Sequence, residues 1–199
     1  MIDTIVFDWG GVLIEQPTVK VIDYCAKYFN IKTKDFSEAI NIYKNDFQKG
    51  ILSESNLWKK VCTSLNLSLP KVNSLWRIAF KEVYQEKKEM FTLVSSLKKR
   101  GYKIGFLSNT ELPAMNFFIE QNYDMIDTCV FSCKEGLIKP DIKIYKILLN
   151  RINSDPKDVI FIDDRQENID AANKLGINGI LFIDEHNLKA DLSFYKIKF

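Results

Sequence analysis

The sequence IVFDWGGVL, residues 5–13, joins a short apolar run to an aspartate and a pair of glycines. A short apolar run between polar residues is typical of a strand that is buried on both faces of a parallel sheet. Sheet packing gives no reason to end such a strand on a carboxylate, and Gly10 and Gly11 would let the backbone turn tightly beside it. Asp8 is therefore the first candidate for a functional residue.

Four more short runs rich in Val, Ile and Phe follow along the chain, each flanked by polar residues. With residues 4–8 they predict five strands, the other four at 102–109, 128–132, 158–164 and 179–184. Apolar residues recur at helical spacing between the last four strands, at 111–122, 141–152 and 166–175. This alternation predicts an α/β fold with a doubly wound, Rossmann-like parallel sheet.

Residues 15–88 break the alternation, because they contain no convincing buried strand. They carry amphipathic stretches at 18–29, 33–48, 53–66 and 72–86. Ser53 is a suitable N-cap for the third of these helices. We predict a core domain made of residues 1–14 and 89–199, with a helical cap domain, residues 15–88, inserted after the first strand.

The composition is that of a globular protein, with 46% hydrophobic residues in a chain of 199. Its 28 Lys and Arg nearly balance 26 Asp and Glu without a long basic block, which argues against a nucleic-acid partner. No run reaches the ~18 apolar residues of a membrane helix, and the N-terminus does not resemble a signal segment. We expect no membrane partner and a cytoplasmic location. Nothing in the sequence predicts an oligomeric state.

The cysteines and the histidine offer no metal site of their own. No Cys-x-x-Cys pair occurs among the four cysteines, and we expect them to be free and mostly buried: Cys25, Cys62, Cys129 and Cys133. The single histidine, His186, follows Asp184 and Glu185 in a segment that we interpret as a solvated loop.

Polar residues end four of the predicted strands, and packing alone does not require them there. They are Asp8, then Ser108 with Asn109 and Thr110, Ser132, and Asp163 with Asp164. The ends of parallel strands lie along one edge of the sheet, which is where such folds bind ligands. Each residue alone could cap a turn or a helix. Together with Lys139 they indicate a shared site.

Three carboxylates at one apolar sheet edge repel one another unless a cation lies between them. Mg²⁺ suits this role, because it prefers oxygen ligands and is usually bound by one or two carboxylates, waters and a substrate phosphate. Lys139 would supply positive charge for a phosphate, and the Ser108 hydroxyl would supply a donor.

These residues stand in four ordered segments that resemble the motifs of the haloacid dehalogenase-like (HAD) superfamily. The segments are Asp8 after the first strand, LSNT at 107–110, Lys139 followed by Pro140, and FIDDRQENIDAANKLG at 161–176. The resemblance spans both ends of the chain and includes the helical cap after the first motif. The glycine pair, GLIKPDIKIY and DDRQEN are similar to the subgroup that contains α-D-glucose-1-phosphate phosphatase.

The resemblance implies a hydrolase, specifically a phosphatase in which Asp8 is the nucleophile and takes up the phosphoryl group as an aspartyl phosphate. It implies Mg²⁺ as the cofactor, held by Asp8, the carbonyl of Gly10, and Asp164. Asp163 and Asn168 match supporting positions around this centre.

The same resemblance implies a phosphate site. Ser108 and Lys139 match phosphate ligands and complete the catalytic set with Asp8, and Asn109 matches a position that contacts phosphate through its backbone. The implied substrate is a small phosphorylated metabolite, with a sugar phosphate as one candidate.

Gly10 departs from the family pattern, in which most phosphatases carry a second aspartate at this position. That aspartate protonates the leaving group and later activates water, so its loss could lower the rate by ~10²- to 10⁴-fold. Three alternatives to a phosphatase stay open: a metal-independent 2-haloacid dehalogenase, a receiver-like signalling domain and, because Gly10 replaces the acid, a catalytically idle HAD-fold binding protein. The first has no need of two adjacent aspartates. In the second, the acidic pair would follow the first strand rather than a later one.

Substrate specificity would come from the cap, where aromatic and basic residues are available. The examples are Tyr43, Phe47, Lys49 and Trp58. For Trp9, beside the nucleophile, we favour packing under the cap over contact with the substrate.

Overall fold

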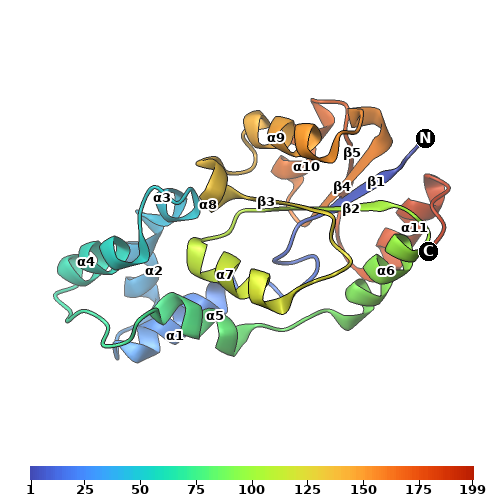
Figure 1. Ribbon diagram of the computed structural model, residues 1–199. Helices are drawn as coiled ribbons and strands as arrows, with labels where there is room; N and C mark the ends of the chain where they lie inside the picture. Colours follow the sequence, from blue (N-terminus) through green and yellow to red (C-terminus); the bar gives the residue numbers. More distant parts are fainter.

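The computed structural model describes residues 1–199 and contains one parallel sheet of five strands in the order β3-β2-β1-β4-β5. Figure 1 shows the sheet edge-on, with helices above and below it. The strands are β1 (Thr4–Phe7), β2 (Lys103–Ser108), β3 (Thr128–Phe131), β4 (Val159–Asp163) and β5 (Asn178–Leu181). The predicted α/β fold with five parallel strands is confirmed.

Alternate residues of the strands point to opposite faces, and each face has its own hydrophobic core. Val6 belongs to the core under α9 (Ile142–Ile152) and α10 (Gln166–Asn173). Ile5 and Phe7 belong to the core on the other face, where α6 (Lys88–Lys99), α7 (Leu112–Gln121) and α11 (Glu185–Phe194) pack. Both faces of the sheet are therefore covered, as the apolar runs predicted.

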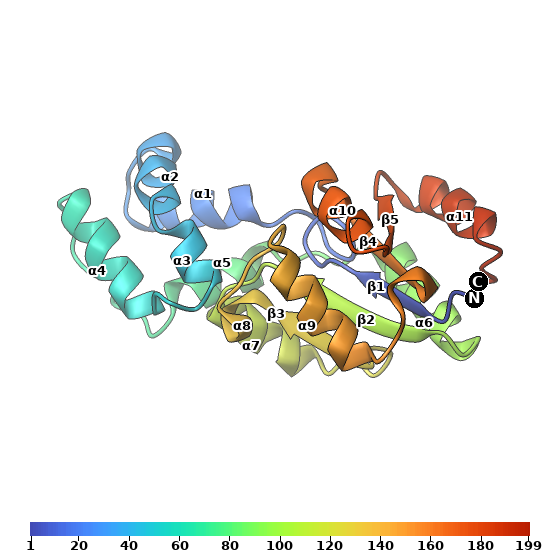
Figure 2. The same ribbon diagram turned by 90° about the horizontal axis from the view of Figure 1, so that it is seen from above.

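Five helices between β1 and α6 lie beyond the carboxyl ends of the strands (Figures 1 and 2). They are α1 (Thr18–Tyr28), α2 (Thr33–Asn41), α3 (Lys44–Gln48), α4 (Glu54–Ser64) and α5 (Leu75–Val83). Ser53 caps α4 as predicted, because its hydroxyl accepts from the Asn56 N–H at 3.3 Å. The division of the chain at residues 15 and 88 stays a prediction.

The two segments that join these helices to the sheet run side by side. The Glu15 N–H donates to the Gln85 carbonyl at 2.9 Å, and the Lys87 N–H donates to the Leu13 carbonyl at 3.0 Å. The Lys87 ammonium also donates to the Gly11 carbonyl at 2.6 Å. This pairing holds the helices directly over the end of β1.

Three sequence expectations differ from the structure. The helix predicted over 33–48 is broken after Asn41, and the chain turns so that Phe47 packs against Trp76 with ring centroids 5.2 Å apart. The strand predicted over 179–184 ends at Leu181. Asp184 instead caps α11, accepting from the Asn187 N–H at 2.8 Å, so the expectation of a loop at His186 was wrong.

Two short elements complete the chain, α8 (Ser132–Glu135) after β3 and a 3₁₀ turn (Pro156–Asp158) before β4.

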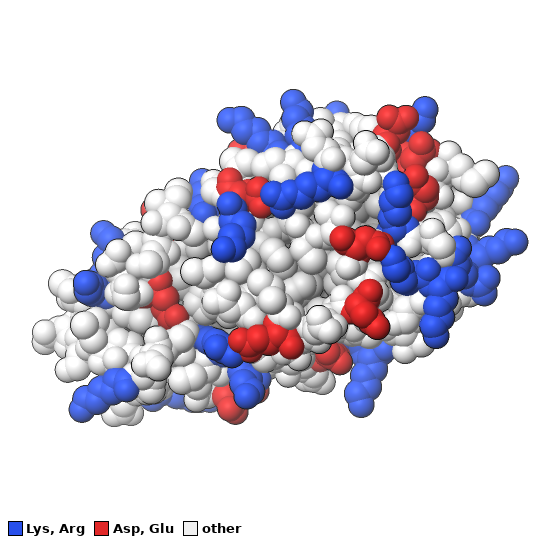
Figure 3. All heavy atoms as spheres, viewed as in Figure 1, with Lys and Arg blue, Asp and Glu red and all other residues white.

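Every helix is too short or too polar to cross a bilayer. On the face in Figure 3, both signs of charge surround a central area without charged atoms, and basic residues gather at the edge where Figure 1 places α6 and the C-terminus.

Candidate active site

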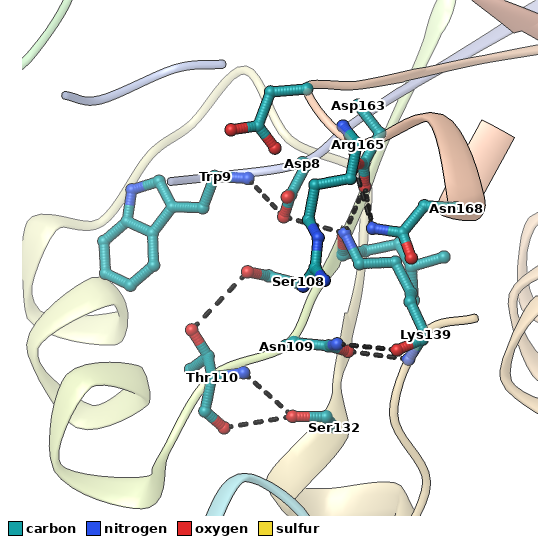
Figure 4. A network of polar contacts seen from close by, with 12 residues as sticks. Asp8, Trp9, Ser108, Asn109, Thr110, Ser132, Lys139, Asp163, Arg165 and Asn168 are labelled. Carbon is teal, nitrogen blue, oxygen red and sulfur yellow. Dashed lines mark hydrogen bonds and ion pairs between the residues drawn. The ribbon is translucent and has the colours of Figure 1, made fainter. Parts of the chain in front are cut away.

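The ends of β1, β2 and β4 bring together the residues that the sequence singled out. Asp8 follows β1, Ser108 ends β2, and Asp163 ends β4. β1 lies between β2 and β4, so these three positions are neighbours at one edge of the sheet. Figure 4 shows Asp8, Asp163 and Lys139 pointing toward one another, as expected for the ends of parallel strands.

Lys139 is the buried cation of this cluster and is only 2% exposed. Its ammonium lies 2.9 Å from Asp8 Oδ1 and 2.6 Å from Asp163 Oδ2, and it donates to the Leu107 carbonyl at 2.9 Å. Its three protons are thus matched by three acceptors. Lys139 holds two carboxylates close together that would otherwise repel each other.

Asp163 is fully buried and has partners on both oxygens. The Asn168 amide donates to Oδ1 at 2.9 Å and to Oδ2 at 3.0 Å, and the Arg165 N–H donates to Oδ1 at 2.9 Å. Lys139 also donates to Oδ2, so both carboxylate oxygens of Asp163 accept from groups of the protein. Its geometry suits the supporting position that the sequence analysis expected for Asp163 and Asn168.

Asp8 keeps one oxygen free of these contacts. Its Oδ1 accepts from its neighbour Trp9 N–H at 2.7 Å and pairs with Lys139, which leaves Oδ2 toward the cavity. Burial raises the pKa of Asp8 to about 6, with Lys139 lowering it and Asp163 raising it. For Lys139, burial alone would lower the pKa, but the charges of Asp8 and Asp163 outweigh it and raise the pKa. The ion pair with Lys139 favours the carboxylate form of Asp8, which a carboxylate nucleophile requires.

Asp164 completes a group of three carboxylates. Oxygens of Asp8, Asp163 and Asp164 lie within 4.8 Å of one another. Burial and the Asp163 charge raise the pKa of Asp164, and its buried Oδ1 has no hydrogen-bond partner. Three carboxylates against one buried ammonium leave an excess of two negative charges. Oxygen ligands with this excess charge fit a hard divalent cation such as Mg²⁺.

Gly11 permits the close approach of the loop after β1 to Asp164. Its φ is +89°, a conformation that other residues adopt only with strain, and a Cβ there would collide with Asp164 Oδ2. The Gly11 N–H donates to the Ile14 carbonyl at 2.9 Å, which closes the loop. Of the two glycines in the opening motif, Gly11 is therefore the one whose backbone conformation and close approach require glycine.

We expect Gly11→Ala to lower the free energy of unfolding by about 1–3 kcal/mol and to weaken divalent-cation binding, because Asp164 must move. Gly101→Ala is the matched control, since Gly101 has φ +91° and no atom within 4 Å of the added Cβ. Denaturant unfolding should show a loss of stability in both variants, and calorimetry should show weaker Mg²⁺ binding only in Gly11→Ala. Equal Mg²⁺ affinity in the two variants would contradict the role of Gly11.

The polar residues that follow β2 have distinct neighbours. Ser108 is buried with its hydroxyl 3.5 Å from that of Thr110. The Asn109 side chain exchanges two hydrogen bonds with the backbone of Lys139, at 2.9 and 2.8 Å, and so places the lysine. The Asn109 side chain is therefore occupied, which is compatible with the expected role of its backbone.

Ser132, the strand-end residue without an assigned role, joins the sheet to the cap. Its hydroxyl accepts from the Thr110 N–H at 2.8 Å and donates to the Gln48 carbonyl at 2.6 Å. The structure brings Ser132 close to the site but uses it to hold α3.

A cavity of about 350 Å³ lies between the strand ends and the cap helices. Asp8, Gly10, Ser108, Asn109, Lys139, Asp164 and Asn168 contribute to its lining. Of the cap residues that the sequence suggested, only Phe47 lines it. Trp58 packs against Phe36 and Trp76 instead. Cavities of this size bind small organic molecules.

Trp9 packs beneath the cap as expected, and it also contributes to the lining of the cavity, so the preference for packing over substrate contact stays a prediction. It is 1% exposed and lies among the rings of Phe80, Tyr84, Phe106 and Phe118. Its backbone N–H nevertheless contacts the nucleophile, as described above.

Several lining residues were not found from the sequence: Gln16, Asn41, Lys44, Gln48, Trp76, Glu111 and Arg165. Glu111 is a buried carboxyl that accepts from Gln48 Nε2 at 3.0 Å and from Trp76 Nε1 at 3.3 Å. Burial raises its pKa, although both donors and Lys44 lower it. Its only local signal was its place three residues after Ser108. Glu111 gives the cap end of the cavity a polar, acidic character.

A model of the haloacid dehalogenase-like hydrolases matches residues 2–176. The chain belongs to this family. The family expectation drawn from the four motifs is thereby confirmed, and the protein is a HAD-like hydrolase. The narrower resemblance to α-D-glucose-1-phosphate phosphatase stays a prediction.

Two relatives of this HAD-like hydrolase are named as phosphatases. The sesquiterpene phosphatase astK of Aspergillus oryzae is 26% identical over 183 residues, which are 90% of this chain and 89% of the relative. The D-ribitol-5-phosphate phosphatase of Bacteroides thetaiotaomicron is 24% identical over 191 residues, 88% of this chain and 89% of the relative.

A solved HAD family enzyme of Bacteroides thetaiotaomicron, in complex with magnesium and inorganic phosphate, has the same fold. It superposes with a TM-score of 0.76 at 22% identity, covering 94% of this chain and 99% of that one. The HAD fold, with a Rossmann-like sheet and helices on both faces, is thus shared over nearly the whole chain.

Proposed function

We propose that this HAD-like hydrolase is a Mg²⁺-dependent phosphatase of a small phosphorylated metabolite, acting through an aspartyl phosphate on Asp8. The observation that carries the proposal is the excess of two negative charges among three carboxylates and one ammonium beside the cavity. Asp8, Asp164 and the Gly10 carbonyl would hold Mg²⁺, which supplies positive charge to a bound phosphate. Relatives named as phosphatases support this class of reaction.

In the first step, the free oxygen of Asp8 forms a bond to phosphorus as the bond to the leaving-group oxygen breaks. Lys139 holds the other oxygen of Asp8 and so orients the nucleophile. Ser108 would donate to a phosphate oxygen. In the second step, water attacks the same phosphorus, the bond to Asp8 breaks, and Asp8 returns to its carboxylate form.

The cavity favours a phosphate ester over a 2-haloacid. A haloacid would bring a carboxylate, without a metal ion, to a site that already has an excess of negative charge. Polar groups at the cap end, among them Asn41, Gln48 and Glu111, suit a leaving group with hydroxyls, and a sugar or polyol phosphate has such groups.

A screen of phosphorylated metabolites tests the proposal. We expect phosphate release with Mg²⁺ and none after chelation, with sugar and polyol phosphates among the best substrates. Chloride release from a 2-haloacid in the presence of chelator would favour the dehalogenase instead. Ligand binding without any turnover would favour an idle binding protein.

Asp164 should be required for cation binding. We expect Asp164→Ala to abolish Mg²⁺ binding in calorimetry, because a carboxylate with a free buried oxygen is lost. Asp155→Ala is the control, since Asp155 is exposed and its nearest cation, Lys157, is 3.8 Å away. Mg²⁺ affinity that stays unchanged in Asp164→Ala would remove Asp164 from the metal site.

The missing acid at residue 10 should make the first step sensitive to the leaving group. We expect the rate of Asp8 phosphorylation to rise as the pKa of the leaving alcohol falls, more steeply than in a Gly10→Asp variant. Rapid-quench kinetics over a series of phosphate monoesters would measure both slopes. Equal slopes would mean that another group already serves as the acid.

A further inference from the structure

We propose that Gln16 is a positioning residue that orients the attacking water, or the leaving oxygen, in the place left open by Gly10. This inference rests on the proposed function and concerns the same cavity. It begins with a fact about Gly10: a Cβ built there would lie 3.3 Å from Gln16 Oε1 and 3.1 Å from Pro17 Cδ. The carboxamide of Gln16 therefore borders the space into which an acidic side chain at residue 10 would extend.

The loop after β1 places Gln16 there. The N–H groups of Val12, Leu13 and Ile14 all donate to the Trp9 carbonyl, at 3.2, 2.9 and 3.0 Å. This tight turn reverses the chain, and Gln16 returns over Gly10. The backbone position of Gln16 is thus set by a loop that hydrogen bonds close.

Two contacts fix the orientation of the carboxamide. The Thr18 hydroxyl donates to Oε1 at 3.1 Å, and the atom that faces the Asp164 carboxylate is assigned as the nitrogen, because an ionised carboxylate only accepts. The amide Nε2 then points toward Asp164, 3.5 Å from its Oδ2. Gln16 also lines the cavity with Asp8 and Asp164. The carboxamide therefore presents a donor and an acceptor to the cavity that Asp8 also lines.

A carboxamide can hold water without exchanging a proton with it. Its N–H donates and its oxygen accepts, so it can orient a water molecule toward phosphorus, and a glutamine has this role in other phosphoryl-transfer enzymes. When water attacks the aspartyl phosphate, the new oxygen–phosphorus bond forms as the bond to Asp8 breaks. Both water protons leave with the product as dihydrogen phosphate. Gln16 neither gains nor loses a proton.

The test separates the two chemical steps with p-nitrophenyl phosphate, whose leaving group needs no protonation. In Gln16→Met, which keeps the length of the side chain but lacks the amide, we expect phosphoenzyme formation within about twofold of wild type. Breakdown of the phosphoenzyme should slow by about 10-fold, the worth of one hydrogen bond. Acid-quenched phosphoenzyme should accumulate in the variant.

Three controls make the result specific. Gln121→Met changes an exposed glutamine of α7 and should alter neither step. Thr18→Val removes the hydroxyl that orients the carboxamide and should slow breakdown by a smaller factor than Gln16→Met does. Mg²⁺ affinity measured by calorimetry should be unchanged in Gln16→Met.

Distinct outcomes contradict distinct claims. Weaker Mg²⁺ binding, or equal slowing of both steps, would mean that Gln16 acts by supporting Asp164 and would overturn its role toward water. Unchanged rates of both steps would overturn it as well. A wild-type protein that forms no phosphoenzyme and releases no phosphate would contradict the proposed function itself.

Discussion

Asp8→Asn is expected to reduce phosphatase turnover by about 10⁴-fold or more, with the fold retained. An amide keeps the shape of the side chain and the contact of Oδ1 with the Trp9 N–H, but its oxygen does not attack phosphorus as a carboxylate does. Removal of a covalent nucleophile has effects of this size or larger in other hydrolases. Steady-state hydrolysis of p-nitrophenyl phosphate would measure the loss, and circular dichroism would verify the fold.

The control for this change is Asp155→Asn, an exposed aspartate away from the cavity, which should have wild-type turnover. Intact-mass analysis after acid quenching adds an independent measurement, because wild type should gain one phosphoryl group and Asp8→Asn none. Near wild-type hydrolysis by Asp8→Asn would contradict the covalent mechanism, whatever the metal dependence.

Lys139→Met should lower the free energy of unfolding by about 3–5 kcal/mol, the largest loss of stability that we expect from one change at this site. Asp8 and Asp163 share this one ammonium at 2.9 and 2.6 Å, and Asp163 is fully buried. Without Lys139, two carboxylates remain close together in an apolar region and lose their counter-charge. Chemical denaturation in the absence of Mg²⁺ would measure the effect.

Two further variants show whether charge is the cause. Lys146→Met changes an exposed lysine of α9, the helix that follows Lys139, and should leave the free energy of unfolding nearly unchanged. The double variant Lys139→Met/Asp163→Asn removes one of the two stranded charges and should recover part of the lost stability. A double variant that is less stable than Lys139→Met would mean that shape, and not charge, dominates at this position.

The fold could be predicted largely from the chain because both faces of the sheet are buried. Residues 5–7 before Asp8 and 159–162 before Asp163 are continuously apolar, which is typical of strands buried on both faces of a parallel sheet. Strand ends then placed Asp8, Ser108 and Asp163 at one edge without knowledge of any contact. Local chemistry also located the cap of α4, where Ser53 precedes the helix. The errors at His186 and after Asn41 lie where a helix boundary depended on a cap or on tertiary packing.

The sequence by itself determined the sheet, the edge that holds the site, and most of the charged residues there, because these follow from periodicity and from residues close in the chain. Only the tertiary structure decided which groups meet across the cavity. Glu111 contacts Gln48 and Trp76 through the docking of the cap on the core, and Gln16 lies over Gly10 because the loop after β1 folds back. The Glu111 contacts join segments that are far apart in the sequence, and the position of Gln16 depends on a loop that backbone hydrogen bonds close. The spacing of residues along the chain predicts neither. The physical reason is that side-chain direction at a cavity depends on packing between whole elements, whereas strand and helix formation depends on near neighbours.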